Sequence, residues 1–361
     1  MFKDYRAILK SFSNEIIPET DTFINDFFDE KISGADLDFM KEILGCIKEY
    51  CLRDGKRIRP LLLLNSYYGY KLVLKNKREI IKLGAVIEMM HSLLLIQDDI
   101  IDRSEMRRGG KALHVELGDR YSSLTNNKLI GQDIASVTAD ILFSLSIEII
   151  SGLNIRHDIK DRFLEIFSKT YEKTAWGQIL DSLNTMPRNI DPANDMPMQI
   201  SIMKTAYYTI VYPLTMGYIL SGGKNKREIA NIESFGIPLG IAFQMRDDIL
   251  GVFGIEKDTG KPNDSDILEG KLTLLVQNTI LRLTGKEREK FIKLFRGSEK
   301  SKDDVGFIRD KIKNSGALDD TLQYHAKLIR DSYSLLDNLA MKQYNKDVMS
   351  GVIEAIEDIN I

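Results

Sequence analysis

Apolar residues recur at helical spacing through almost the whole chain. In its last part, steps of three, four or seven separate Leu318, Leu322, Ile329, Leu336 and Leu339, which places them on one face of a long helix. No convincing segment alternates apolar and polar residues as a half-buried strand does. The connecting segments read as short and polar. The pattern therefore predicts an all-α protein.

Length and composition favour one large helical domain. The chain has 361 residues, of which 43% are hydrophobic, so it can bury a large core. It contains only 8 prolines, and no glycine-rich or serine-rich linker interrupts it. We therefore predict a single domain over residues 1–361.

Composition also limits the classes of partner and compartment. The net charge of -3 gives no basic surplus for nucleic acid, so we expect no nucleic-acid partner. Cys46 and Cys51 are too few for a disulfide framework or a zinc site, and we expect core thiols. The apolar runs fall short of the roughly 18 residues of a membrane span. The first residues lack the apolar stretch of a signal peptide, so the sequence predicts a cytoplasmic protein.

Three aspartates follow an apolar run in "LLLIQDDIID". In a helix Asp98 and Asp102 lie on one face and Asp99 lies beside them, so their charges repel by roughly 0.2 to 0.5 kcal/mol per pair. Carboxylates clustered without histidine or cysteine suit a hard cation such as Mg²⁺. A solvated acidic face is the alternative for an isolated triplet.

A second acidic pair, Asp247 and Asp248 in "FQMRDDILG", also follows an apolar run. If the two helices face each other across a cavity, their carboxylates would bind several Mg²⁺ ions, which would need an anion to share. A diphosphate meets that need, and arginine and lysine are the side chains that grip its oxygens. Such residues stand in "GKRIRP", "RRGG", "KTAYYT", "TGKP" and "EGKLT".

With "GQILD" added, these motifs stand in the order found in the trans-polyprenyl diphosphate synthases, which the chain resembles from "GKRIRP" to "GKLTLL". Members of that family condense isopentenyl diphosphate with allylic diphosphates and use Mg²⁺. The resemblance implies a polyprenyl synthetase domain built as a bundle of long helices around a deep central cavity. It also implies a homodimer without an integral membrane segment.

The resemblance assigns roles to individual residues. Mg²⁺ binding falls to Asp98, Asp99, Asp102, Asp247 and Asp248, which with Lys204 would be the catalytic residues. The isopentenyl diphosphate site would consist of Lys56, Arg59, His91 and Arg108. The allylic diphosphate site would consist of Arg107, Lys204, Thr205, Gln244, Lys261 and Lys271.

Two departures from the family pattern affect these motifs. Gln97 precedes the first aspartates where the family commonly has histidine, and we expect this change to be tolerated, because glutamine also forms hydrogen bonds. Gly251 stands where the family often has a third aspartate of the second motif. Glu256 and Asp258 are then the candidate carboxylates to replace it.

Product length is predicted from the residues before the first aspartates. Leu94, Leu93 and Met90 stand four, five and eight residues before Asp98 and would line successive depths of the pocket at about 1.5 Å per residue. Short-chain members commonly carry an aromatic residue at the first or second of these positions. Leucine at both predicts room for a C20 product, geranylgeranyl diphosphate. Flexible Met89 and Met90 leave longer products open.

Two other functions share part of this pattern. A class I terpene cyclase would use the aspartates but has no use for an isopentenyl diphosphate site. A catalytically silent regulatory subunit typically loses an aspartate motif, whereas this chain keeps five of the six expected aspartates. An elongating prenyltransferase, of this or another product length, is therefore the favoured prediction.

Overall fold

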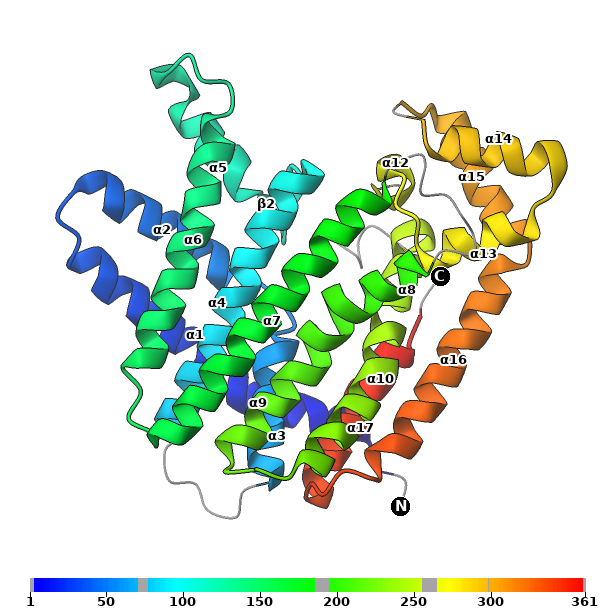
Figure 1. Ribbon diagram of the computed structural model, residues 1–361. Helices are drawn as coiled ribbons and strands as arrows, with labels where there is room; N and C mark the ends of the chain where they lie inside the picture. Colours follow the sequence, from blue (N-terminus) through cyan, green and yellow to red (C-terminus); the bar gives the residue numbers. More distant parts are fainter. Residues whose placement is uncertain (1–2, 71–76, 186–194, 255–264, 298, 360–361) are drawn as a thin grey trace. The chain divides into compact units, whose positions relative to one another are not determined.

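The computed structural model describes residues 3–70, 77–185, 195–254, 265–297 and 299–359, and helices make up most of them (Figure 1). Within these residues the strands are confined to one short hairpin. The all-α prediction is confirmed. The elements are α1 (Tyr5–Ser33), α2 (Asp38–Leu52), α3 (Ile58–Tyr70), α4 (Lys77–Asp102), β1 (Met106–Arg107), β2 (Gly110–Lys111), α5 (Leu113–Tyr121), η1 (Ser122–Leu124), α6 (Ile130–Ser151), α7 (His157–Asn184), α8 (Met196–Ile200), the π-helix η3 (Ser201–Val211), α9 (Tyr212–Leu220), α10 (Lys226–Phe253), α12 (Ser265–Glu269), α13 (Leu274–Arg282), α14 (Gly285–Phe295), α15 (Lys302–Asn314), α16 (Ala317–Leu336) and α17 (Gln343–Glu357).

The helices pack into two compact units. The N-terminal unit comprises Ile8–Ser168 and Pro213–Lys224, and the C-terminal unit comprises Met1–Ala7, Lys169–Tyr212 and Asn225–Ile361. Each unit buries apolar residues of its own, so the single domain over the whole chain stays a prediction.

The core of the N-terminal unit is built around α4. This helix buries residues on most of its circumference and packs against α3 and α6, as a helix that is apolar on nearly every side must. The four leucines Leu61–Leu64 of α3 are fully buried. Pro60 lies in the first turn of α3, where its missing N–H costs little. Tight packing on α4 therefore fixes the position of its last turn.

The three aspartates of the first motif lie at the C-terminal end of α4. The helix is closed by Arg103 in the left-handed region, with φ +56°, and by the Ser104 N–H, which donates to the Asp99 carbonyl at 2.9 Å. Negative side chains at a helix C-terminus oppose the helix dipole. Helix stability therefore does not account for their presence.

The β1–β2 hairpin follows directly after this helix end. Its strands are antiparallel, with Arg107 opposite Gly110, and the two turn residues Arg108 and Gly109 have φ +50° and +79°. Positive φ at both turn residues is the mark of a type I′ hairpin turn. The sequence prediction missed this hairpin, because two-residue strands are too short to show an alternating pattern.

The C-terminal unit is organised around α10, which packs along η3 and α16. One apolar cluster of this unit joins Ile249 of α10 to Ile267 of α12 and to residues of α13, α14 and α15. Thr284 and Glu287 have the spacing of a capping box at the start of α14, but the Thr284 side chain makes no capping bond. The capping box forms instead at the start of α15, between Ser301 and Asp304.

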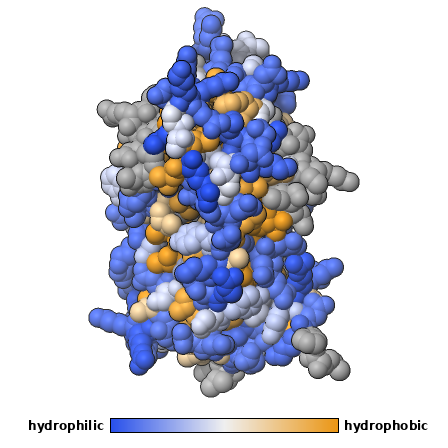
Figure 2. Space-filling view, turned by 90° about the vertical axis from the view of Figure 1, so that its right-hand side faces the viewer, coloured by the Kyte–Doolittle hydropathy of each residue, from blue (hydrophilic) through white to orange (hydrophobic). Residues whose placement is uncertain are grey.

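Exposed apolar side chains are unevenly distributed. On the side shown in Figure 2, hydrophilic residues cover most of the surface and apolar residues lie in patches between them. On α6, by contrast, Val137 and Ile141 are 60% and 37% exposed. Among the described residues, α6 is also the one helix long and apolar enough to cross a membrane, and 44% of its most apolar window is buried within the protein. A core helix of a protein in water passes the same test, so this is weak evidence for a span.

Candidate active site

The charges of four arginines act on a buried histidine in the N-terminal unit. His91 on α4 is only 9% exposed. Burial, followed by the charges of Arg59, Arg108, Arg107 and Arg57, holds the pKa of His91 well below its usual value near 6.5. The imidazole is therefore neutral at physiological pH, and three of the four guanidinium groups also pair with carboxylates of the same unit. The structure thus brings together the four predicted residues Arg59, His91, Arg107 and Arg108.

A buried arginine that sequence analysis missed supports this group. Arg57 adopts φ +46°, a strained conformation for a residue with a side chain. Its side chain is 1% exposed and forms ion pairs with Asp21 at 3.0 Å and Glu88 at 2.8 Å. These bonds hold the segment between α2 and α3, in which Lys56 is exposed beside Arg57. Arg59 lies two residues further on, at the start of α3.

Replacing Glu88 with glutamine should destabilise the protein by about 3 kcal/mol, because it leaves the buried Arg57 charge without its closest partner. Glu88 is itself 1% exposed and also lies 3.5 Å from Arg108. Thermal or urea unfolding measures the loss. Asp119→Asn is the matched control, since Asp119 forms an exposed pair with Lys111 in the same unit and its replacement should leave the unfolding midpoint unchanged. Equal stability of Glu88→Gln and wild type would refute the assigned role of the buried pair.

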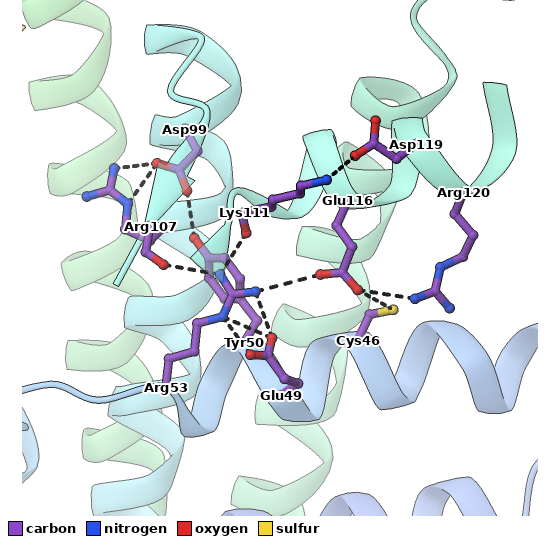
Figure 3. Close-up of polar contacts among 10 residues, drawn as sticks. All are labelled: Cys46, Glu49, Tyr50, Arg53, Asp99, Arg107, Lys111, Glu116, Asp119 and Arg120. Carbon is purple, nitrogen blue, oxygen red and sulfur yellow. Dashed lines mark hydrogen bonds and ion pairs between the residues drawn. The ribbon is translucent and has the colours of Figure 1, made fainter. Parts of the chain in front are cut away.

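Asp99 of the first aspartate motif is fully buried, and its carboxylate accepts hydrogen bonds from other residues of the protein. Its carboxylate accepts a hydrogen bond from the Tyr50 hydroxyl at 2.8 Å and another from Arg107 Nε at 2.7 Å (Figure 3). Burial and the neighbouring Asp99 charge raise the pKa of Tyr50, which keeps its hydroxyl protonated as a donor. Arg107 also reaches Asp98 at 3.3 Å. Asp99 therefore fixes the direction of Arg107.

Asp98 and Asp102 are the more accessible carboxylates of this motif. Both are partly exposed and lie one helical turn apart on α4. Within the described part of the chain, no three histidine, cysteine or carboxylate side chains are arranged as a metal site. The assignment of Asp98, Asp99, Asp102, Asp247 and Asp248 to Mg²⁺ therefore stays a prediction.

A second group of predicted residues meets in the C-terminal unit. Lys204 on η3 forms an ion pair with Asp181 of α7 at 2.8 Å. The neighbouring Thr205 hydroxyl donates to the Gln244 side-chain oxygen, and Gln244 Nε2 donates to Asp248 Oδ1 at 2.7 Å. Sequence analysis did not assign a role to Asp181, although it ends the quoted "GQILD" motif. Hydrogen bonds thus join Thr205, Gln244 and Asp248, and the charge of Asp181, which pairs with Lys204, also acts on Asp248.

Carboxylates crowd around Asp248. Asp248 is 6% exposed. Burial raises the pKa of its carboxyl group well above the usual value near 3.8, and the charge of Asp266, followed by those of Asp247 and Asp181, raises it further. The hydrogen bond from Gln244 acts in the opposite direction. A bound cation would relieve this repulsion.

The position of Gly251 is filled by Asp266. A Cβ atom placed on Gly251 would lie 2.3 Å from Asp266 Oδ2 and 2.9 Å from its Cγ. Asp266 belongs to α12, which the fully buried Ile267 anchors in the core of the C-terminal unit. A carboxylate from α12 therefore occupies the place where the family often carries its third aspartate. The sequence offered only Glu256 and Asp258 for this role, and both lie outside the described residues.

The remaining predicted residues are placed as follows. Lys271 forms an ion pair with Glu269 at 2.8 Å. Lys261 lies outside the described residues. On α4, Leu93 and Met90 are each 1% exposed, whereas Leu94 is partly exposed.

Comparisons with known proteins agree on one family. Residues 40–312 match the polyprenyl synthetase family. A short chain isoprenyl diphosphate synthase from Methanothermobacter thermautotrophicus is 33% identical over 274 residues, which cover 75% of this chain and 78% of the relative. A geranylfarnesyl diphosphate synthase from Aeropyrum pernix is 32% identical over 304 residues, which cover 83% of this chain and 86% of the relative.

A solved structure shares the fold. The geranylgeranyl pyrophosphate synthase from Corynebacterium glutamicum, determined with isoprenyl diphosphate and magnesium, superposes with a TM-score of 0.86 at 23% identity. The match covers 95% of this chain and 99% of that one. Because the family match extends over most of the chain and the relatives exceed 30% identity across it, the chain belongs to the polyprenyl synthetase family and is a prenyltransferase.

Proposed function

We propose that this protein condenses isopentenyl diphosphate with an allylic diphosphate and releases pyrophosphate. The observation that carries the proposal is the gathering of Arg59, Arg107 and Arg108 around neutral His91, next to the aspartates that end α4. A diphosphate anion is a ligand that arginine side chains bind through paired hydrogen bonds. The second polar group, around Lys204 and Asp248, would serve the allylic diphosphate.

We propose that carboxylates of this chain bind Mg²⁺. The crowding of Asp248 by Asp266, Asp247 and Asp181 is electrostatically unfavourable without a cation. Asp98 and Asp102 would hold Mg²⁺ in the first motif, and Asp247 and Asp248 in the second, with Asp266 in place of the missing third aspartate. Mg²⁺ would neutralise the charge that develops on the departing pyrophosphate.

Other predicted site residues would bind the two substrates. Arg59, Arg108, His91 and the exposed Lys56 would bind isopentenyl diphosphate. Arg107, held in place by Asp99, would bind the allylic diphosphate. The allylic carbon–oxygen bond would break, and the isopentenyl double bond would form the new carbon–carbon bond. Loss of one proton to the released pyrophosphate would complete the product. Apolar side chains of α4 would keep water from the reacting carbons.

The proposed product is geranylgeranyl diphosphate, with shorter or longer chains as alternatives. Leu93 and Met90 would border the growing chain on α4, because both are buried and lie within two and a half turns of Asp98. Neither side chain is as bulky as the aromatic residue that would end the pocket earlier.

Leu93→Phe should shorten the main product toward C15, since the larger ring would fill the space of the last isoprene unit. Chromatography of the dephosphorylated products measures the change. Leu95→Phe is the control, because Leu95 projects about 200° around the helix from Leu93 and should not alter product length. A folded and active Leu93→Phe enzyme with unchanged products would place the chain along another face of α4.

We also propose that the protein acts as a cytoplasmic homodimer. The exposed Val137 and Ile141 give α6 an apolar face, yet Asp133, Asp140 and Glu148 on the same helix would be costly in lipid. A second copy of the chain is therefore a better cover for this face than a bilayer. Sedimentation equilibrium should give twice the chain mass, and a monomer at micromolar concentration would contradict the proposal.

Activity measurements separate the competing functions. Purified protein with Mg²⁺, labelled isopentenyl diphosphate and each allylic diphosphate in turn should yield longer prenyl diphosphates. A terpene cyclase would consume the allylic substrate without incorporating the label. A silent regulatory subunit would do neither until its partner was added.

A further inference from the structure

The hairpin that carries Arg107 and Arg108 is fastened to the end of α2 by one arginine. Arg53 Nη1 donates to the main-chain carbonyl of Lys111 at 2.8 Å and to that of Arg107 at 3.2 Å (Figure 3). The Arg53 side chain is only 7% exposed. One guanidinium group therefore binds both strands of the hairpin, on either side of its turn.

Other contacts hold Arg53 in this orientation. Glu49 accepts from Arg53 Nε at 2.9 Å, and Arg53 Cζ lies 4.8 Å from the centre of the Tyr50 ring. Glu116 of α5 lies 3.6 Å from Arg53 Nη2. Figure 3 shows these groups converging on Arg53 from α2 and α5. Because several contacts fix the planar guanidinium, it can hold the hairpin in one position. We call this contact of Arg53 with the hairpin the clasp.

Two glycines leave space for arginine side chains, Gly110 for Arg53 and Gly55 for Arg108. A Cβ atom on Gly110 would lie 2.7 Å from Arg53 Cζ, so any side chain there would displace the guanidinium. In the opposite direction, a Cβ atom on Gly55 would lie 2.9 Å from Arg108 Cζ. Arg53 thus packs against Gly110 of the hairpin, and Arg108 of the hairpin packs against Gly55. The hairpin and the connection between α2 and α3 are interlocked.

We propose that Arg53 and Gly110 are positioning residues for the diphosphate-binding arginines Arg107 and Arg108. A two-residue strand pair is too short to hold a fixed conformation by itself, and Arg108 carries the cost of a left-handed backbone at φ +50°. The clasp supplies the missing restraint. The inference rests on the proposed function, because it predicts an effect on the binding of the two diphosphates.

The test compares Arg53→Ala, Gly110→Ala and the double variant in steady-state kinetics. Each single change should raise the KM for isopentenyl diphosphate about tenfold to a hundredfold, since small displacements of binding groups carry costs of this size. The double variant should be no worse than the more impaired single variant, because both changes break one contact. Arg53→Lys should recover part of the loss, as lysine retains the charge and can reach one carbonyl. Lys111→Ala is the control on the same hairpin, because its side chain forms an exposed ion pair with Asp119 and its removal should leave KM unchanged.

The possible outcomes are distinct. If the wild-type enzyme does not use isopentenyl diphosphate, the proposed function fails. If the wild type is active and either folded single variant keeps its normal KM, the clasp is refuted while the proposed function stands. Independent, multiplicative losses in the double variant would also refute it, because they would mean that Arg53 and Gly110 act separately. Should Arg53→Ala fail to fold, Gly110→Ala and Arg53→Lys provide the same comparison.

Discussion

Asp248→Asn should lose most of its turnover while its metal-free form becomes more stable than wild type. The asparagine keeps the size of the side chain and its bond from Gln244, but it removes a buried charge that faces Asp266, Asp247 and Asp181. Loss of a group that acts on the charge developing in the transition state costs roughly a hundredfold in kcat. Because the folded-state pKa of Asp248 is raised, the wild type loses stability as the pH rises through that pKa. The stability gain of the variant should therefore be greatest at alkaline pH and vanish below the usual carboxyl pKa.

Kinetics and thermal unfolding in a chelator measure the two halves of this expectation. Added Mg²⁺ should raise the unfolding temperature of wild type more than that of Asp248→Asn. Asp319→Asn removes an exposed carboxylate of the same unit and should change neither quantity. A variant that retains normal turnover would remove Asp248 from the active site. A less stable metal-free variant would contradict the electrostatic account of the carboxylate cluster.

Asp98→Ala should lower kcat by roughly a hundredfold or more and leave the fold intact. The fold should survive because Arg107 keeps its shorter bonds to Asp99, and removal of one charge relieves repulsion along α4. Near-normal turnover would contradict the assignment of Asp98 as a metal ligand.

Asp99→Ala provides the contrast within the same motif. Asp99 is buried and bonded to both Tyr50 and Arg107, so its loss should lower the unfolding temperature as well as activity. Two variants with the same stability and the same kinetic defect would mean that the neighbouring aspartates do not differ in role.

Sequence analysis predicted the parts of this protein that depend on local pattern. Helical spacing of apolar residues gave the all-α class, and short motifs identified Arg59, His91, Arg107 and Arg108, which the structure brings together. The all-α prediction is confirmed, because spacing along the chain determines which side chains share a helix face. The roles given to the four site residues rest on the resemblance and stay predictions, since Arg59, His91 and the two hairpin arginines lie on separate elements.

What sequence analysis missed depends on contacts between distant segments. Arg53 touches a hairpin more than fifty residues away, and Asp266 fills the position beside Gly251 from another helix. Neither position shows its partner in the local pattern. The buried pair of Arg57 and Glu88 was hidden for the same reason, since charged residues are ordinarily exposed. Tertiary packing decides these contacts.

The most direct test of the account is the stoichiometry of the reaction. Purified protein would be supplied with Mg²⁺, an allylic diphosphate and labelled isopentenyl diphosphate, and both pyrophosphate release and label in the prenyl product would be measured. We expect one pyrophosphate released for each isopentenyl unit incorporated, and neither product when Mg²⁺ is removed. Pyrophosphate released from the allylic substrate without incorporation of label would contradict it.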